Sequence, residues 1–340
     1  MEGRNSTYRK TRRLRWSALS SGVYVGLGLA ALALLVLLAR ASLPEQPAGA
    51  AVIWSPHEVS AVAIQGDSVW AGGAEGLVVV NRYTSEVEAP PGERRTFRYV
   101  KDILVDRGNR VWVAHEAGVS RYADGEWKHL SAADGLLAGP ALALWEDTAG
   151  ALWVGSTLGV VRWSGDSWVT YTTRDGLAAS QVDVIFQDWD GVMWFGSSAP
   201  TQGGLTSFDG RVWRTYYVSD GLAHNSINAI MQDRDGALWF GTGFHDRGGA
   251  SRLSVGVWSS LSPKDGLAGD KVRSLFEDRQ GRLWFGSEYH GVAVYDGSKW
   301  RILTTDDGLA SWEVKEIVQD ADGAFWLATL EGLNRLASVE

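Results

Sequence analysis

Six histidines and several acidic clusters are the side chains of this chain best suited to metal binding or acid–base chemistry. The densest cluster of functional groups is Phe244-His245-Asp246-Arg247. Cysteine is absent, which excludes disulfides, thiolate nucleophiles and thiolate metal ligands. No nucleophile elbow, phosphate loop or metal-spacing motif is present, so we predict no catalytic residue, no metal site and no cofactor. The histidines are His57, His115, His129, His224, His245 and His290.

Three Asp-x-Asp-Gly segments, beginning at Asp188, Asp233 and Asp320, resemble the start of a calcium-binding loop. None is followed by the further oxygen ligands and the twelfth-position glutamate that such a loop needs. Each lies between two short apolar runs, where Asp caps its own backbone and Gly adopts positive φ. We therefore interpret the segments as turns, and we expect Asp235 and Trp239 to serve stability.

These turns belong to a unit that recurs seven times at intervals of 41 to 45 residues. Each unit has four short strands and one central Trp, the size of a propeller blade, and no stretch past residue 50 has a helical apolar period. The sequence predicts an all-β fold, a seven-bladed β-propeller over residues 51–340, with the tryptophans in its core. Asp-Gly-Leu begins at Asp134, Asp175, Asp220, Asp265 and Asp307, and the strand tryptophans are Trp70, Trp112, Trp153, Trp194, Trp239, Trp284 and Trp326.

The last unit contains three strands before Glu340, and its fourth strand is missing. Ala51-Val52-Ile53-Trp54 resembles the fourth strand of the other units. We therefore predict that residues 51–55 pair into the last blade and close the ring.

The first fifty residues differ in composition from the repeats. Residues 1–15 carry six basic side chains, and residues 16–39 are uncharged over 24 positions, which is long enough for a transmembrane helix. This pattern predicts a cytoplasmic basic tail, a signal anchor in the lipid bilayer and a linker over 40–50, with the propeller outside. A cleaved signal peptide is the alternative, because Ala39-Arg40-Ala41 and Ala48-Gly49-Ala50 have the form of cleavage sites.

The propeller segment is acidic. The chain has 32 Lys and Arg against 40 Asp and Glu; without the first 15 residues, which hold six basic and one acidic side chain, 26 and 39 remain, a net charge of −13. No basic stripe is visible, so we expect no nucleic-acid partner.

The repeated unit resembles the two-component regulator propeller repeat. The copy that begins Trp168-Val169-Thr170-Tyr171 and continues through Asp175-Gly176-Leu177 carries its markers. The resemblance implies an extracytoplasmic input module of a bacterial membrane sensor, associated with polysaccharide breakdown products. It places the protein in the bacterial cytoplasmic membrane as a single-pass chain, with the propeller periplasmic or extracellular. No helical relay, kinase or receiver follows the repeats, so we expect no kinase output of its own.

Where the seven copies disagree in polarity, a residue is free to serve a ligand. The disagreements fall after Asp-Gly-Leu, at the start of the innermost strand and between the second and third strands. Strand alternation brings these regions to one end of the ring, where we expect a carbohydrate or other polar small molecule, or a membrane signalling partner. The candidate ligand-binding residues are Lys101, Asp183, Asn228, Phe244, His245, Asp246, Arg247, Arg273, Glu288, Tyr289, His290, Trp312 and Lys315.

Two other functions remain open from the sequence. Propeller lyases, including the streptogramin lyase type to which the repeats are loosely similar, use His and Glu with a metal on one face. A lyase or hydrolase with a metal-assisted site is therefore one alternative, since His115, His245 and His290 all fall in turns of the same end. A purely structural docking module of the cell envelope is the other.

Overall fold

The structure is a computed structural model that describes residues 50–53, 58–93, 97–165, 167–199 and 202–337. The predicted tail (1–15), membrane helix (16–39) and linker up to residue 49 lie outside the described residues. Within the described ranges, no helix has the length and apolar character needed to cross a membrane. All the described residues belong to one compact unit, Gln46–Glu340.

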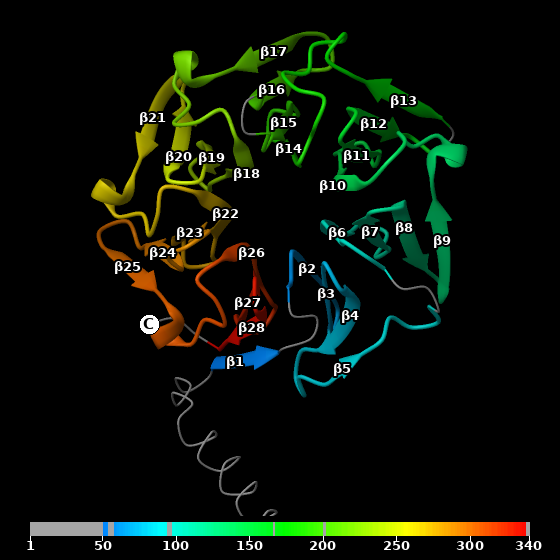
Figure 1. Ribbon diagram of the computed structural model, residues 1–340, viewed down its shortest axis with the longest axis horizontal. Coiled ribbons are helices and arrows are strands. Elements are labelled where there is room, and N and C mark those ends of the chain that lie inside the picture. The colour runs from blue at the N-terminus through cyan, green and yellow to red at the C-terminus, as the bar shows by residue number, and fades with distance from the viewer. Residues whose placement is uncertain (1–49, 54–57, 94–96, 166, 200–201, 338–340) are drawn as a thin grey trace, which may run out of the picture. The chain divides into compact units, whose positions relative to one another are not determined.

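Seven antiparallel four-stranded sheets form a ring, and the predicted seven-bladed all-β propeller is confirmed (Figure 1). In each sheet the first strand lies next to the central axis and the fourth lies at the periphery. The first three sheets comprise β2 (Ala61–Gln65), β3 (Ser68–Gly73), β4 (Gly76–Asn81) and β5 (Val87–Glu88); β6 (Asp102–Val105), β7 (Val111–His115), β8 (Gly118–Ala123) and β9 (Glu126–Leu130); and β10 (Ala141–Glu146), β11 (Leu152–Ser156), β12 (Val160–Trp163) and β13 (Trp168–Tyr171).

The next three sheets comprise β14 (Val184–Gln187), β15 (Met193–Ser197), β16 (Gly204–Phe208) and β17 (Trp213–Tyr216); β18 (Ile227–Gln232), β19 (Leu238–Phe244), β20 (Arg247–Ser254) and β21 (Val257–Leu261); and β22 (Val272–Glu277), β23 (Leu283–Ser287), β24 (Val292–Tyr295) and β25 (Trp300–Leu303). Short 3-10 turns join several blades: η1 (Ala132–Asp134), η2 (Val218–Asp220), η3 (Pro263–Asp265) and η4 (Thr305–Asp307).

The seventh sheet combines both ends of the unit. Its strands are β26 (Val314–Gln319), β27 (Phe325–Thr329), β28 (Gly332–Leu336) and β1 (Ala50–Ile53), in that order from the axis outward. β1 pairs antiparallel with β28, so that Ile53 lies opposite Leu333. The closing strand begins at residue 50, and Trp54 and Ser55 lie outside the described residues. This pairing leaves β28 without an open edge.

A carboxylate ties each Asp-x-x-Gly turn to the core tryptophan of its blade. In the fifth blade, Asp233 accepts the Trp239 indole N–H at 2.7 Å through Oδ2 and the Ala237 N–H at 2.8 Å through Oδ1. Five other blades repeat this bond, and in the first blade the Gln65 amide oxygen accepts from Trp70. These buried oxygens are occupied by protein donors, which agrees with a turn rather than a calcium loop. The repeats are Asp106–Trp112, Asp147–Trp153, Asp188–Trp194, Asp278–Trp284 and Asp320–Trp326.

The Asp-Gly-Leu element is where consecutive blades meet. Asp265 accepts hydrogen bonds from the backbone N–H and the hydroxyl of Ser262, which closes η3. Gly266 follows at φ 121°, and a Cβ at this position would stand 2.4 Å from the ring of Trp300 in the next blade. Leu267 is 2% exposed beneath it. Gly is therefore required for both its conformation and the close approach of the neighbouring blade.

Bulges interrupt four of the innermost strands. The register of the first and second strands shifts at Leu142, Asn228, Arg273 and Lys315. In the other three blades the equivalent residues, Ser60, Lys101 and Asp183, directly precede the strand. A bulge or strand start leaves a side chain outside the regular alternation and re-aims it. One side chain from each blade is thereby directed at the same end of the central channel.

Candidate ligand-binding face

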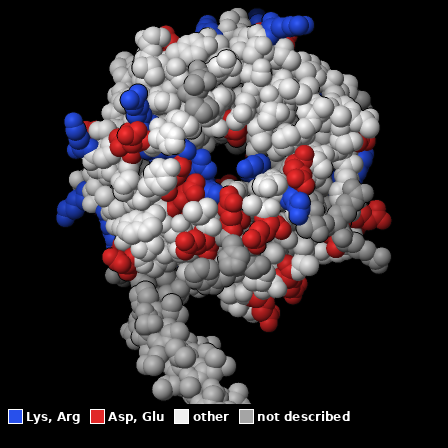
Figure 2. All heavy atoms as spheres, viewed as in Figure 1, with Lys and Arg blue, Asp and Glu red and all other residues white. Residues whose placement is uncertain are grey.

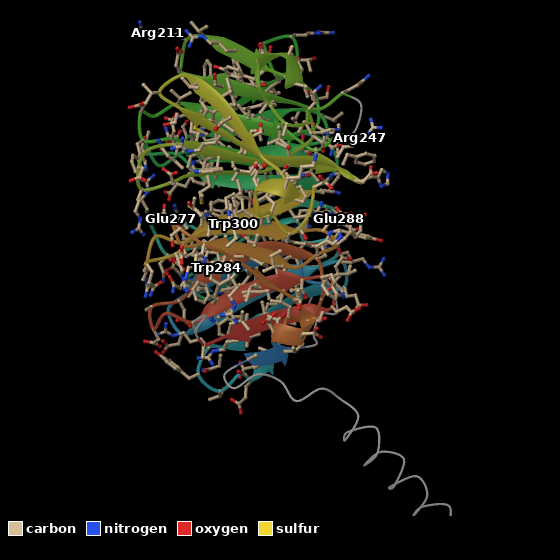
Figure 3. The ribbon with its side chains drawn as sticks, turned by 90° about the vertical axis from the view of Figure 1, so that its left-hand side faces the viewer. Arg211, Arg247, Glu277, Trp284, Glu288 and Trp300 are labelled. Carbon is tan, nitrogen blue, oxygen red and sulfur yellow. The ribbon has the colours of Figure 1, made fainter. Side chains whose placement is uncertain are left out.

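The loops joining second to third strands and fourth to first strands emerge at one end of the ring. Figure 3 shows Arg247 and Glu288 at this end and Arg211 and Glu277 at the other. Figure 2 views the same end face-on: charged side chains of both signs gather around a central opening. We call this end the variable face.

The central opening is the mouth of a channel. A cavity of 390 Å³ lies at the mouth and a second cavity of 220 Å³ continues inward, sharing the inner-strand side chains of the seven blades. The lining of the mouth is strongly polar, with Leu142 as its single aliphatic side chain. The mouth cavity is lined by Ser60, Lys101, Leu142, Thr157, Gln181, Asp183, Ser198, Asn228, Arg273 and Lys315.

A separate cavity of 270 Å³ lies on the fifth and sixth blades. The hairpin of β19 and β20 forms one wall, because these are the longest strands and carry their turn beyond the neighbouring blades. The turn residue His245 has φ 54°, the left-handed conformation that a tight hairpin needs. The lining consists of His245, Asp246, Asp270, Lys271, Glu288, Tyr289 and His290, and we call it the hairpin cavity.

Glu288 is the most highly connected group of the hairpin cavity. It forms an ion pair with Lys271 and a hydrogen bond with the Tyr289 hydroxyl. Burial would raise the pKa of Glu288, but the hydrogen bonds from Lys271 and Tyr289 outweigh it and lower that pKa. The same hydrogen bond raises the pKa of Tyr289, so the phenol keeps its proton. The cavity thus presents a fixed carboxylate beside a neutral phenol and an ammonium group.

An alternating set of charges borders the channel mouth. Lys315 Nζ lies 2.6 Å from Glu58 Oε1 and 3.8 Å from Glu313 Oε2. Arg273 Nε lies 3.3 Å from Glu313 Oε1. Burial raises the pKa of Glu313, against the opposing effect of Lys315 and Arg273. The pairs join the sixth, seventh and first blades, so the border is held across the junctions between them.

Two half-buried carboxyl residues stand deeper in the channel. Asp102 accepts the Leu144 N–H at 2.7 Å, and Glu316 accepts the Val62 N–H at 2.7 Å, each from the next blade. Burial raises the pKa of Asp102 to about 6. Burial, together with the nearby Asp102, raises the pKa of Glu316 to about 8. Near neutral pH the pair therefore retains a proton.

Most of the predicted candidates line one of these cavities. Lys101, Asp183, Asn228, Arg273 and Lys315 line the mouth, and His245, Asp246, Glu288, Tyr289 and His290 line the hairpin cavity. The structure thus divides these candidates into two groups, one at each cavity, a division that the sequence could not make.

Three candidates line neither cavity. The Phe244 ring packs against the His245 ring at 4.2 Å, and Arg247 is exposed on the outer side of the hairpin turn. Trp312 is 46% exposed, and its carbonyl accepts the Gly291 N–H. These residues border the variable face without contributing to a cavity.

The candidate set omitted Glu58, Asp270 and Glu313, and it omitted Lys271 although Lys271 is one of the positions after Asp-Gly-Leu at which the copies differ. Counting two residues back from the bulge position aligns a further column across the blades. Glu58, Lys271 and Glu313 belong to it, and Trp312 does not. Comparing copies from the inner strand, instead of from Asp-Gly-Leu, would have placed Glu58 and Glu313 beside Lys271. The column reads Glu58, Tyr99, Pro140, Gln181, Ser226, Lys271 and Glu313.

The five described histidines do not gather at one place. His115 is 8% exposed and its Nε2 lies 2.8 Å from the Ser120 hydroxyl, whose other neighbour is His129 Nδ1 at 2.8 Å. His57 lies outside the described residues. Across the described ranges no three His, Asp or Glu side chains are grouped to hold a metal ion. Among the histidines that the structure describes, His245 and His290 are the pair that shares a cavity.

Residues 221–244 and 266–289 match the family model described as two-component regulator propeller. No curated protein matches the chain. Among solved structures, the chain is similar to the extracellular domain of BT3049 from B. thetaiotaomicron, described as a putative hybrid two-component system, at 20% identity and TM-score 0.74. It is also similar to PorZ, a surface component of the type-IX secretion system of Porphyromonas gingivalis, at 16% identity and TM-score 0.66.

A third similar structure is a catalytically inactive variant of virginiamycin B lyase from Staphylococcus aureus with quinupristin, at 13% identity and TM-score 0.66. The alignments cover 85%, 84% and 85% of this chain and 41%, 47% and 99% of those three chains, in the order named. The chain thus spans less than half the length of the first two. At these identities the likeness establishes the propeller fold.

Proposed function

Because the chain carries two-component regulator propeller repeats, we propose that it is an extracytoplasmic sensor or interaction module that binds a polar, hydroxyl-rich ligand at its variable face. One observation carries the proposal. Ten side chains that differ between the repeats line two cavities at the same end of the ring, whereas the repeated Trp and Leu side chains are buried in the blades. A further cavity of 460 Å³ lies at the opposite end, lined by residues at the turns between first and second strands. Repeat symmetry is thus broken around the first two cavities.

The chemistry of the lining supports a polar ligand. The hairpin cavity offers a neutral phenol and a paired carboxylate, which together donate and accept hydrogen bonds to hydroxyl groups. The exposed ring of Tyr289 can cover an apolar face of a sugar or a similar ring. A small carbohydrate fragment has this combination of faces.

A binding screen tests the proposal. Soluble neutral and charged oligosaccharides are presented to the purified protein, and binding is measured by isothermal titration. Tyr289→Phe removes one hydroxyl and Glu288→Gln removes the charge, so each should weaken a ligand of the hairpin cavity by about 1–3 kcal/mol. Asp209, at the opposite end, provides the control variant Asp209→Asn. A ligand unaffected by Tyr289, Glu288, Asp246 and Arg273 changes together would contradict the location.

The location in the cell is part of the same proposal. The uncharged stretch 16–39 behind a basic tail supports a single-pass anchor in the cytoplasmic membrane, with the propeller periplasmic or extracellular. The likeness to an extracellular domain of a two-component system supports the same side. A phosphatase active only outside the cytoplasm, fused after Glu340, should be active. A soluble chain beginning at Ser42 or Ala51 would instead identify a cleaved signal peptide.

A further inference from the structure

We propose that the channel mouth binds an oxyanion, a carboxylate or a phosphate, through Lys101, Arg273 and Lys315. The proposal rests on the proposed function and deepens it, because it assigns the ligand a negative charge and a place in the ring. The three cations come from the second, sixth and seventh blades, and all three line both cavities of the channel.

The three cations retain unused donors. Arg273 meets Glu313 through Nε, which leaves the outer edge of the guanidinium for a two-point contact with an oxyanion. Lys315 is held by Glu58 and Glu313, and its side chain is 7% exposed, so its position is preset. Within the described ranges the Lys101 ammonium group has no hydrogen-bond or ion-pair partner, although it lies near enough to Glu58 to help lower the pKa of that carboxyl.

The carboxylates of this region do not occupy the anion position. Glu58 and Glu313 pair with the cations but do not line the mouth cavity. Asp183 does line it, but its two oxygens accept from Gln181 Nε2 at 2.8 Å and from Ser198 N–H at 2.7 Å. The one acidic side chain that lines the mouth is thus hydrogen-bonded, and three cationic side chains line the same cavity.

The inner cavity makes the site pH-sensitive. Its charged and titratable lining consists of the three cations with Asp102, Asp183 and Glu316. Burial raises the pKa of both Asp102 and Glu316, so acidification removes negative charge from the channel below the cations. A carboxylate ligand, which stays ionised over this range, should therefore bind more tightly at the mouth at pH 5 than at pH 9.

The experiment compares glucuronate with glucose, two molecules that differ in one carboxylate, and adds inorganic phosphate as the second oxyanion source. Binding to the purified propeller is measured by isothermal titration at low ionic strength. We expect glucuronate or phosphate, and not glucose, to bind with dependence on these cations. Lys101→Met should weaken binding at least tenfold. Arg273→Lys keeps the positive charge but loses the two-point contact of the guanidinium, so it should weaken binding severalfold. Arg211→Ala, a cation at the opposite end, should leave it unchanged.

The outcomes separate the two proposals. If glucose binds as tightly as glucuronate, or if neither oxyanion binds, the anion site is wrong while a neutral ligand of the hairpin cavity survives. Oxyanion binding that resists both Lys101→Met and Arg273→Lys would move the site elsewhere and also overturn this inference. Preference for phosphate over glucuronate would support the site and identify the source as a phosphorylated ligand. An unchanged temperature of thermal unfolding shows that each variant keeps the fold.

Discussion

Two sets of acidic side chains, at opposite ends of the ring, have different partners. At the end formed by first-to-second strand turns, Asp233 and its equivalents accept a core indole and their own turn N–H groups. At the variable face, Glu58, Glu288 and Glu313 meet Lys and Arg side chains around open cavities. The first arrangement is copied in six blades, and the second occurs where copies differ. The repeated carboxylates thus hold their own turns, whereas Glu58, Glu288 and Glu313 pair with cations beside the cavities. Ion pairs that cross between blades occur at both ends, since Arg107–Glu146 and Arg234–Glu277 lie at the first end.

Removing the strand that closes the ring has the largest expected effect on stability. A chain beginning at Ser55 lacks β1 and exposes the edge of β28 and the pocket of Ile53. We expect aggregation or a loss of unfolding free energy of roughly 3 kcal/mol or more, measured by urea denaturation. A chain beginning at Gln46 is the control and should keep full stability. Equal stability of the two chains would contradict closure by β1.

Asp233→Ala tests the scaffold end. The change leaves the Trp239 indole and two turn N–H groups without their acceptor, so the unfolding free energy should fall by about 2–4 kcal/mol. Asp235→Ala is the matched control two residues away; only its backbone N–H takes part in the turn, so its effect should stay within ~0.5 kcal/mol. The structure thus assigns to Asp233 the stabilising role that the sequence suggested for Asp235. A larger loss for Asp235→Ala would reverse the assignment.

Glu316→Gln tests the channel carboxyls by their pH dependence. The pKa of Glu316 is raised from 4.5 to about 8 in the fold, so its contribution is fully present below pH 4.5 and lost as pH rises through 8. The unfolding free energy should therefore fall between pH 5 and pH 9, by on the order of 2–4 kcal/mol. Denaturation of Glu316→Gln at pH 5, 7 and 9 should show a much flatter profile, whereas exposed Glu88→Gln should follow the parent chain. If the profiles of Glu316→Gln and the parent chain ran parallel, Glu316 would not be the source of the pH dependence.

Asp246 and Arg247 give the smallest expected change in stability and the finest test of the site. Both lie at the exposed hairpin turn, so Asp246→Ala and Arg247→Ala should each change the unfolding free energy by less than ~0.5 kcal/mol. Of the two, Asp246 lines the hairpin cavity and Arg247 does not. A ligand of this cavity should therefore be weakened by Asp246→Ala and little affected by Arg247→Ala in titration. Equal losses would extend the site to the outer side of the turn.

The repeat itself determined the architecture. Seven Trp-bearing units with both strand faces apolar bury those faces only against one another, so the number of copies specifies the number of blades. The incomplete last unit, with Ala51-Val52-Ile53 left over before the first, likewise predicted the strand that closes the ring. Turn chemistry was also local, since Asp and Gly form the same bend in every copy. These features depend on neighbouring residues in the chain and on the period.

The site depended on contacts between blades, which a single unit does not encode. Bulges at Asn228, Arg273 and Lys315 direct variable residues toward one end of the channel, and alternation alone does not reveal a bulge. The pairing of Lys315 with Glu58 joins residues 257 positions apart. Sequence variation among the repeats identified the end of the ring at which the variable side chains gather. Only the tertiary structure decided which variable residues share a cavity, because that depends on how far each hairpin extends and which charges lie across a blade junction.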